Sequence, residues 1–206
     1  VCRELGTKLF HISTDEVYGS IIEGQFSEDD KLEPRNPYSA TKAAAEHLIT
    51  SYHNTYRTEY IMVRPSNNFG PRQHKEKFLP TIINSLNNGN KIPIYGNGEN
   101  IRDWLFVKDN VRMIYDLWQN SELNEVYNIS LNNERKNLDV VKTILKILEK
   151  SFEENAEFID DRPGHDFRYS ISNKKIENLN LCVEANFEEN LLETISWFTK
   201  NPQGEE

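Results

Sequence analysis

Tyr38 and Lys42 form a Tyr-x-x-x-Lys pair close to the start of a predicted helix. Residues four apart lie on one face of a helix, so the ammonium group can sit close to the phenol. A free tyrosine has a pKa of about 10, and a nearby cation in a partly dry cleft lowers that pKa. The pair therefore indicates a tyrosine that works as a base, while the same spacing also fits two exposed neighbours on a helix.

Asp15 and Glu16 form the second candidate pair, directly after an apolar segment over residues 8–13 that predicts a buried strand. In an open α/β sheet, ligands bind beyond the carboxyl ends of the strands. Two neighbouring carboxyl groups can divide the roles of acid and base when their environments separate their pKa values. The alternative is a polar loop in which one carboxylate caps a neighbouring element.

The elements that must position these residues alternate between helices and strands. Asn36-Pro37 is a start signal for the second helix, Pro65 is expected to stop the second strand, and Asn137 stands where an N-cap belongs. We expect helices over residues 3–6, 38–56, 75–86, 109–119, 138–148 and 187–198, and strands over 8–13, 59–64, 101–107, 126–130 and 157–159. This alternation predicts an α/β fold with a sheet that is at least partly parallel.

The composition excludes several classes of protein. The 206 residues carry a net charge of −9, which argues against a nucleic-acid-binding surface. No apolar run approaches the roughly 18 residues of a membrane helix, and no secretory signal opens the sequence. Cys2 and Cys182 are far apart, so we expect no disulfide framework and a reducing, cytoplasmic compartment. The histidines have no metal-ligand spacing, and we predict no metal.

These two pairs, together with five further blocks, resemble the dTDP-glucose 4,6-dehydratases of the extended short-chain dehydrogenase/reductase family. The Thr-Asp-Glu triplet over residues 14–16 is the discriminating mark, because the related epimerases lack the acidic pair. The five blocks are SNNFGP at 66–71, KEKFLP at 75–80, PIYG at 93–96, IRDW at 101–104 and DRPGHD at 161–166.

The resemblance implies a doubly wound, NAD-binding Rossmann sheet and a smaller α/β substrate-binding domain. We expect residues 1–65 to be the C-terminal part of the Rossmann domain, with a later return of the chain near 101–130, and residues 66–206 to be mainly the nucleotide-sugar-binding domain. The glycine-rich turn of the family does not occur in this sequence. We therefore expect the C-terminal two-thirds of a family member, inactive in isolation, with an exposed apolar edge at Leu9, Phe10 and Ile12.

The resemblance also implies a reaction. An NAD-dependent enzyme converts dTDP-glucose to dTDP-4-keto-6-deoxyglucose by oxidation at C4, loss of water across C5–C6 and return of hydride to C6. Tyr38 takes the proton of the C4 hydroxyl, which Thr14 hydrogen-bonds, and Lys42 holds the cofactor ribose and lowers the Tyr38 pKa. Glu16, ionised, then removes the C5 proton, while Asp15, protonated, donates to the departing C6 hydroxyl.

The same resemblance implies the binding residues. Ser13, Tyr38, Lys42 and Asn68 fall on the cofactor side. Arg102 and Arg162 are candidates for the diphosphate, because the guanidinium fork matches phosphate oxygens. The remaining candidate contacts with sugar or nucleotide are Asn67, Lys77, Phe78, Pro93, Tyr95, Asn137 and His165.

The sequence leaves open the oligomeric state and two alternative functions. The family implies a homodimer through the Tyr38 helix, but the apolar stripe of Ala44, Leu48 and Tyr52 also fits the core of a monomer. Neither nucleic acid nor a membrane is expected as a partner. One alternative is a UDP-glucose 4,6-dehydratase, since a base methyl discriminates by only about 1 kcal/mol. The other is a truncated, non-catalytic module that binds a nucleotide sugar.

Overall fold

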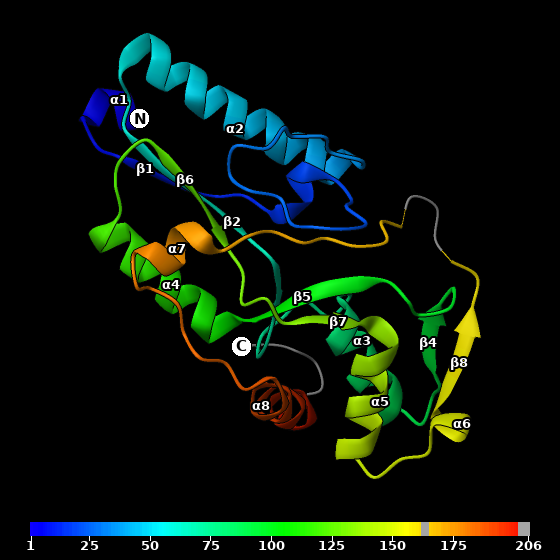
Figure 1. The fold of residues 1–206 in the computed structure, drawn as a ribbon. Helices are drawn as coiled ribbons and strands as arrows, with labels where there is room; N and C mark the ends of the chain where they lie inside the picture. Colours follow the sequence, from blue (N-terminus) through cyan, green and yellow to red (C-terminus); the bar gives the residue numbers. More distant parts are fainter. Residues whose placement is uncertain (162–164, 202–206) are drawn as a thin grey trace.

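A parallel sheet forms the part of the molecule that carries the Tyr-Lys helix. The computed structural model describes residues 1–161 and 165–201, and within these residues the strands form three small sheets (Figure 1). The first sheet has the order β1-β2-β6, with β1 spanning Leu9–Ile12, β2 Tyr60–Pro65 and β6 Glu125–Ile129. Both pairs of neighbours are parallel, which confirms the predicted α/β fold.

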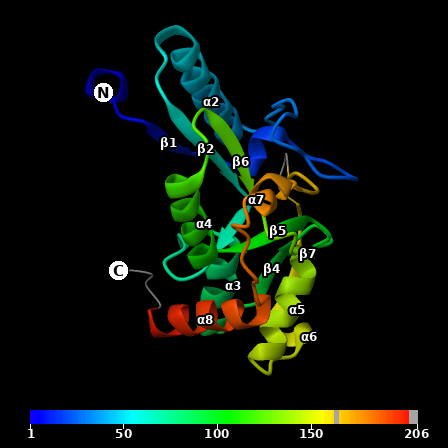
Figure 2. The same cartoon turned by 60° about the vertical axis from the view of Figure 1, so that its left-hand side comes forward.

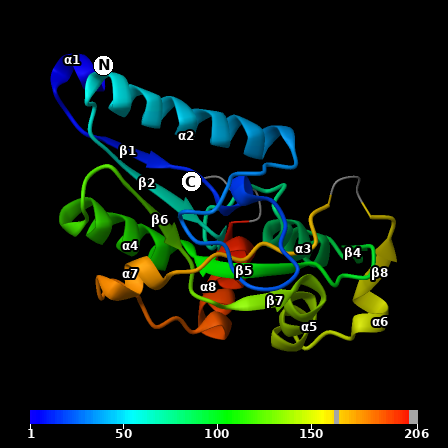
Figure 3. The ribbon, with the colours of Figure 1, turned by 45° about the horizontal axis from the view of Figure 1, so that its top comes forward.

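The central strand of this sheet explains its sequence. Every residue of β2 is buried, and its first four residues form a continuous apolar run instead of an alternating one. Helices cover it on both faces, α2 (Pro37–Tyr56) on one and α4 (Val107–Asn120) on the other (Figure 3). Within the described residues β1 lies at an edge, with Leu9 and Phe10 half-buried and Ile12 48 % exposed.

The start of α2 is set by its cap. The Asn36 side-chain oxygen accepts the Ser39 backbone N–H at 2.9 Å, and the Ser39 hydroxyl bonds the Asn36 backbone N–H at 3.3 Å. This reciprocal capping box, with Pro37 as first helical residue, starts the helix one residue earlier than predicted.

Two further sheets follow. The second has the order β3-β5-β7, with β3 spanning Asn67–Phe69, β5 Ile101–Phe106 and β7 Glu134–Lys136. β3 pairs with β5 in parallel, and β7 pairs with β5 antiparallel. The third joins β4 (Ile92–Tyr95) to β8 (Ala156–Ile159) in parallel. β3, β4 and β7 were not predicted, because NNF and ERK are polar and IPIY contains a proline, so none of the three shows the apolar pattern of a strand.

The larger apolar core lies beside these two sheets. The helices α3 (Phe78–Asn87), α5 (Asn137–Ile147) and α8 (Phe187–Lys200) gather there, at the end of the molecule away from α2 (Figure 2). The predicted apolar face of α5 is confirmed, since Val140, Val141, Ile144 and Leu145 are buried. The chain returns to the first sheet through α4, β6 and the short α7 (Lys174–Asn178), whereas β5 belongs to the second sheet. The remaining short helices are α1 (Cys2–Leu5), the 3-10 turn η1 (Asp15–Tyr18) and α6 (Phe152–Asn155).

Three predicted boundaries were wrong. Helix α3 begins at Phe78 instead of residue 75, because Lys77 is its cap. Asn137 is not an N-cap but the first residue of α5, since its backbone N–H bonds the Asn100 carbonyl at 2.9 Å. Pro65 is the last residue of β2 instead of the first residue after it, and the next residue, Ser66, supplies the N–H that bonds the Ile129 carbonyl.

Among residues 1–161 and 165–201, no helix combines the length and apolar character that crossing a bilayer requires.

Candidate active site

The turn that follows β1 carries the acidic pair. The Ser13 backbone N–H bonds the Val63 carbonyl at 2.8 Å, so the turn leaves the carboxyl end of β1 directly. Thr14 caps the turn η1, and its hydroxyl oxygen accepts the Glu16 N–H at 3.3 Å. This local geometry buries Asp15, which is 4 % exposed, and leaves Glu16 half-buried beside it.

The start of α2 lies against this turn. Tyr38, the second residue of α2, is 52 % exposed, and its phenol lies close enough to the Thr14 hydroxyl for that group to influence its pKa. The Asn36 side-chain amide donates to a Glu16 carboxylate oxygen at 3.1 Å. Lys42 donates from Nζ to the Ile12 carbonyl at the end of β1, at 2.9 Å. The structure therefore brings all five predicted catalytic residues, Thr14, Asp15, Glu16, Tyr38 and Lys42, to one place.

Asp15 has the protonation behaviour of an acid that works near neutral pH. Burial, and after it the neighbouring Glu16, raise the pKa of its carboxyl from 3.8 to about 7, against smaller opposing effects of the Thr14 hydroxyl and Arg102. The Thr14 hydroxyl donates to Asp15 Oδ1 at 3.2 Å, while Asp15 Oδ2 is buried without a hydrogen-bond partner among the described residues. A carboxyl in this state can hold a proton for donation beside a second carboxyl.

Tyr38 differs from the sequence expectation. Burial raises the pKa of its phenol, Glu16 raises it further, and the nearby Thr14 hydroxyl opposes both. The expected lowering by Lys42 is not found, because the Lys42 ammonium is held at the Ile12 carbonyl. The carboxylates of the turn therefore dominate the electrostatics of the phenol.

A buried arginine closes the other side of the turn. Arg102 on β5 donates to the backbone carbonyls of Asp166 at 2.8 Å and Phe167 at 3.1 Å, and its guanidinium lies 4.4 Å from the centre of the Tyr169 ring. The effect of Arg102 on the Asp15 pKa shows that its charge reaches the acidic pair. A phosphate bound at Arg102 would interact with a guanidinium whose orientation is already fixed by its hydrogen bonds to backbone carbonyls.

Tyr169 and Asp166 are residues of this site that sequence reasoning missed. The Tyr169 hydroxyl donates to Asp166 Oδ2 at 2.6 Å, and burial, this bond and Glu16 raise the pKa of the Tyr169 phenol. Asp166 also pairs with Arg35, just ahead of α2, at 3.4 Å. Asp166 ends a recognised block, but its contacts reach across more than a hundred residues of chain, and no local pattern marks them.

Polar groups at the carboxyl ends of β1 and β2 fit a polar ligand. The hydroxyls of Ser13 and Ser66 are buried and have no hydrogen-bond partner among the described residues. Buried polar groups are nearly always bonded, so these two indicate a place for a ligand. Asn68 lies beside them, where its side chain donates to the Ser66 carbonyl at 3.0 Å and accepts from Asn110 at 2.7 Å. Asn68 is thus tied to the end of β2, and Ser13 follows the end of β1, the strand that pairs with β2.

The predicted substrate residues lie in two places. Asn67, on β3, is opposite Trp104 on β5, and its Oδ1 is also buried without a partner among the described residues. Phe78 packs against the Trp104 ring, with the ring centres 5.7 Å apart, and the exposed Lys77 caps α3 beside it. Pro93 and Tyr95 lie instead on β4, in the separate two-stranded sheet (Figure 1).

The turn after β4 brings this second group to α5. Gly98 has a φ of +72°, and its carbonyl accepts the Leu138 N–H at 3.0 Å, which places Tyr95 and Asn137 at the two sides of one turn. His165 bonds Asp161 through Nδ1 at 2.7 Å, and Asp161 packs against Gly96 of the same turn. Arg162 lies outside the described residues.

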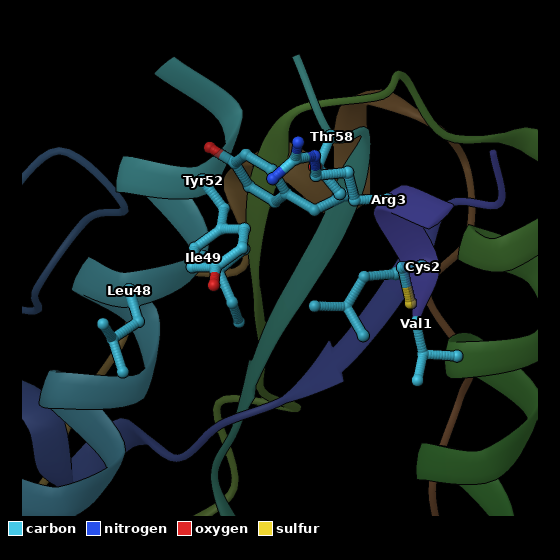
Figure 4. Close-up of a pocket in the computed structure, with 9 residues that line it drawn as sticks. Val1, Cys2, Arg3, Leu48, Ile49, Tyr52 and Thr58 are labelled. Carbon is cyan, nitrogen blue, oxygen red and sulfur yellow. The ribbon is translucent and has the colours of Figure 1, made fainter. Parts of the chain in front are cut away.

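Within the part of the chain that the structure describes, the site overlaps neither a cluster of metal-binding side chains nor the apolar cavity beside α1. The described residues contain no group of three or more His, Cys, Asp or Glu side chains placed to share a metal ion. An apolar cavity of about 200 Å³ lies between α1, α2 and the first sheet, lined by Leu48, Ile49 and Tyr52 among others (Figure 4). It contains none of the residues that the turn and Tyr38 bring together.

Comparison with known proteins gives consistent relatives. A family model described as GDP-mannose 4,6 dehydratase matches residues 1–194. The chain is 44 % identical over 191 residues to the low-salt glycan biosynthesis protein Agl12 of Haloferax volcanii, covering 93 % of this chain and 61 % of that one. It is 40 % identical over 222 residues to a dTDP-glucose 4,6-dehydratase of Escherichia coli, covering 98 % and 61 %. The chain thus spans about three fifths of the length of these curated relatives.

Solved structures agree with the fold. DesIV, a dTDP-glucose 4,6-dehydratase of Streptomyces venezuelae solved with NAD bound, superimposes with a TM-score of 0.94 at 35 % identity, covering 98 % of this chain and 63 % of that one. A dTDP-glucose 4,6-dehydratase of Bacillus anthracis in complex with NAD has a TM-score of 0.92 at 39 % identity, covering 98 % and 66 %. These matches confirm the predicted Rossmann-type architecture.

Proposed function

Because the chain belongs to the GDP-mannose 4,6-dehydratase family, we propose that it carries the catalytic and substrate-binding residues of an NAD-dependent dTDP-glucose 4,6-dehydratase. The product of this reaction is dTDP-4-keto-6-deoxyglucose. The observation that carries the proposal is the buried Asp15 carboxyl, whose pKa is about 7, beside Glu16 and within the same cluster as Tyr38. A 4-epimerase needs no acid to expel water, so this pair favours dehydration.

Tyr38 acts first on the sugar. Its phenol, at the start of α2 and close to Thr14, takes the proton of the C4 hydroxyl as that carbon is oxidised. Thr14 serves this step by orienting both the phenol and the hydroxyl. A cation close to the phenol would offset the two carboxylates and lower the raised pKa of Tyr38.

Asp15 and Glu16 act next. The new C4 ketone acidifies the C5 proton, and Glu16 removes it, held in place by the Asn36 amide. Asp15 donates its proton to the C6 hydroxyl, which leaves as water. One carboxyl must be neutral and the other ionised at this moment, and burial of Asp15 beside a second carboxyl supports that division.

The residues present fit part of an NAD site. The unpartnered hydroxyls of Ser13 and Ser66, the oriented amide of Asn68, and Lys42 would hold the cofactor beside Tyr38. When bound, NAD supplies the acceptor and later the donor of the hydride exchanged with the sugar. The DesIV and Bacillus anthracis structures named above contain it.

The substrate-binding residues support a nucleoside diphosphate sugar. Arg102 would pair with the diphosphate, together with Arg162. Asn67, Lys77, Phe78 and His165 would contact the sugar and phosphates, while Pro93, Tyr95 and Asn137 would surround the base at the turn after β4. The exposed stripe of Leu48, Tyr52 and Tyr56 on α2 supports a homodimer formed through that helix.

One experiment tests the function. The protein in its natural length is incubated with NAD⁺ and either dTDP-glucose or UDP-glucose, and the sugar nucleotide is followed by mass spectrometry. Loss of one water from dTDP-glucose, faster than from UDP-glucose, is expected, and Tyr38→Phe should abolish it. Unchanged mass with both substrates despite bound NAD overturns the dehydratase proposal. A faster reaction of UDP-glucose keeps the chemistry and changes the nucleotide.

A further inference from the structure

A buried arginine stands behind the catalytic turn and outside the predicted site. Arg64, on β2, is 5 % exposed, and Glu46, on α2, is 2 % exposed. Arg64 Nη2 lies 2.6 Å from Glu46 Oε2, and Arg64 Nε lies 3.1 Å from each carboxylate oxygen. The fork of the guanidinium thus fixes the distance and the rotation between α2 and the central strand.

The third nitrogen of the same group reaches the catalytic turn. Arg64 Nη1 donates to the Tyr18 hydroxyl and to the Glu28 carbonyl, the latter at 3.2 Å. The Tyr18 hydroxyl in turn donates to Asn128 Oδ1 on β6 at 2.8 Å, and its ring stacks on Phe26 with the ring centres 5.1 Å apart. Tyr18 is therefore held by both hydroxyl and ring, and is completely buried.

Both ends of this network are sequence neighbours of the proposed catalytic residues. Tyr18 closes the η1 turn that Asp15 and Glu16 open. Glu46 follows Lys42 by four residues, one turn further along the same face of α2. Resting on the proposed function, we infer that Arg64 is a positioning residue that holds the Asp15–Glu16 turn and the Tyr38–Lys42 helix in register with each other.

Stability alone does not explain this arrangement. Replacement of a buried ion pair by apolar side chains of similar volume is often neutral or stabilising, so such pairs are weak evidence of a stabilising role. The guanidinium orients two neighbours at once, because it has separate N–H donors for Glu46 on one side and for Tyr18 on the other. A lysine supplies a single point charge and cannot reproduce this fork.

The contacts between the proposed catalytic residues and their neighbours do not hold the end of the η1 turn in place. Asn36 ties the first turn of α2 to Glu16, and Lys42 ties α2 to the end of β1. Neither contact touches Tyr18, where the η1 turn ends. Arg64 fixes that end, so Asp15 and Glu16 are anchored on both sides.

The first test compares Arg64→Lys and Tyr18→Phe with the full-length holoenzyme. We expect kcat for water loss to fall about 10- to 100-fold in both, because small misplacements of reacting groups have effects of that size. KM for the nucleotide sugar should change less than about threefold, since neither side chain faces the substrate. Tyr18→Phe keeps the ring that stacks on Phe26, so we expect it to fold. Its kcat can therefore be measured even if an Arg64 variant does not fold.

Chemical rescue separates positioning from charge balance. A surface cavity of about 420 Å³ ends on Arg64 and Glu46, so a small cation can enter the space that Arg64→Ala creates. Methylguanidinium should restore part of the lost kcat, whereas methylammonium at the same concentration should not, because it lacks the fork. Equal rescue by both cations assigns Arg64 a charge-balancing role and overturns the inference.

Arg168→Lys is the matched control. Arg168 forms another two-point pair, with Glu134, at 2.7 and 2.8 Å, and bonds neither α2 nor η1. It should lose stability without the selective loss of kcat. Wild-type kcat in Arg64→Lys and Tyr18→Phe, or an equal kcat loss in Arg168→Lys, overturns the inference.

A readout without substrate keeps the two proposals separable. Amide hydrogen exchange in residues 15–19 and 37–46 should speed up in Tyr18→Phe and Arg64→Lys, but not in Arg168→Lys. If the wild-type protein dehydrates neither sugar nucleotide while this pattern is seen, the proposed function fails and the coupling of turn and helix stands. Unchanged exchange in both segments overturns the coupling.

Discussion

The Asn36 side chain joins the helix cap to the catalytic turn through its two ends. Its oxygen accepts the Ser39 N–H at 2.9 Å, and its nitrogen donates to Glu16 Oε2 at 3.1 Å. The residue that starts α2 is thus the same residue that orients the proposed C5 base. Capping and catalysis share one amide, so substitutions that preserve only one of its ends can separate the two roles.

Asn36→Ser keeps the cap and removes the bond to Glu16. We expect the free energy of unfolding to stay within about 0.5 kcal/mol of wild type, because serine and asparagine cap equally well. Asn36→Ala, which removes both functions, should cost about 1 kcal/mol. Both variants should slow water loss at least about fivefold. Chemical denaturation and kcat measure the two effects, and wild-type kcat in Asn36→Ser would show that the Glu16 contact has no catalytic role.

The rate of water loss should depend on the protonation of Asp15. Burial and the nearby Glu16 raise the pKa of this carboxyl to about 7, and the proposed acid is its protonated form. The kcat for dehydration should therefore fall as the pH rises through about 7. Asp15→Asn should abolish water loss, while oxidation at C4 stays detectable as reduced nicotinamide. A profile that is flat between pH 6 and 9 contradicts the assignment.

The same carboxyl should make stability depend on pH. The folded-state pKa of Asp15 lies above its ordinary value of 3.8, so its contribution is complete below about pH 4 and is lost as the pH rises through about 7. The difference between 3.8 and about 7 corresponds to at most about 4 kcal/mol.

Asp15→Asn should therefore be more stable than wild type at pH 8 and close to it at pH 4. Thermal unfolding at the two pH values measures this difference. Glu23→Gln, which changes an exposed carboxylate, is the control and should show no such crossover. An Asp15→Asn variant that is less stable than wild type at pH 8 would refute the destabilising burial of this carboxyl.

A side chain at Gly98 should destabilise the turn after β4. It has a φ of +72°, and a Cβ there would lie 3.0 Å from both Ile94 Cγ2 and Leu138 Cβ. Gly98→Ala should lower the free energy of unfolding by about 1 to 3 kcal/mol, from backbone strain and crowding. Because the turn seats Tyr95 and Asn137, KM for the nucleotide sugar should rise with little change in kcat.

Gly89→Ala is the matched control for Gly98→Ala. Gly89 also has a positive φ, of +70°, but a Cβ there meets nothing within 4 Å. In the control, the free energy of unfolding should fall only by the cost of the backbone conformation, and KM should stay unchanged. Equal effects of the two substitutions would show that crowding at the turn does not matter.

Local patterns predicted much of this molecule. The Tyr-Lys spacing, the acidic pair after a strand, the cap of α2 and the apolar face of α5 are all set by residues within a few positions of one another. Periodicity and capping express contacts that recur every two to four residues, which is why they can be read along the chain. These patterns marked Tyr38, Lys42, Asp15 and Glu16 as candidates, and the resemblance to a known family added Thr14 and the proposed roles.

Tertiary structure alone decided how those residues behave. The pKa of Asp15 depends on burial and on Arg102 from β5, Lys42 bonds the end of β1, and Arg64 meets Tyr18 and Glu46 from a third element. The short strands β3, β4 and β7 exist only because partners distant in sequence complete them. Burial and long-range hydrogen bonds arise when segments far apart in the chain meet, and no short stretch of sequence contains both partners.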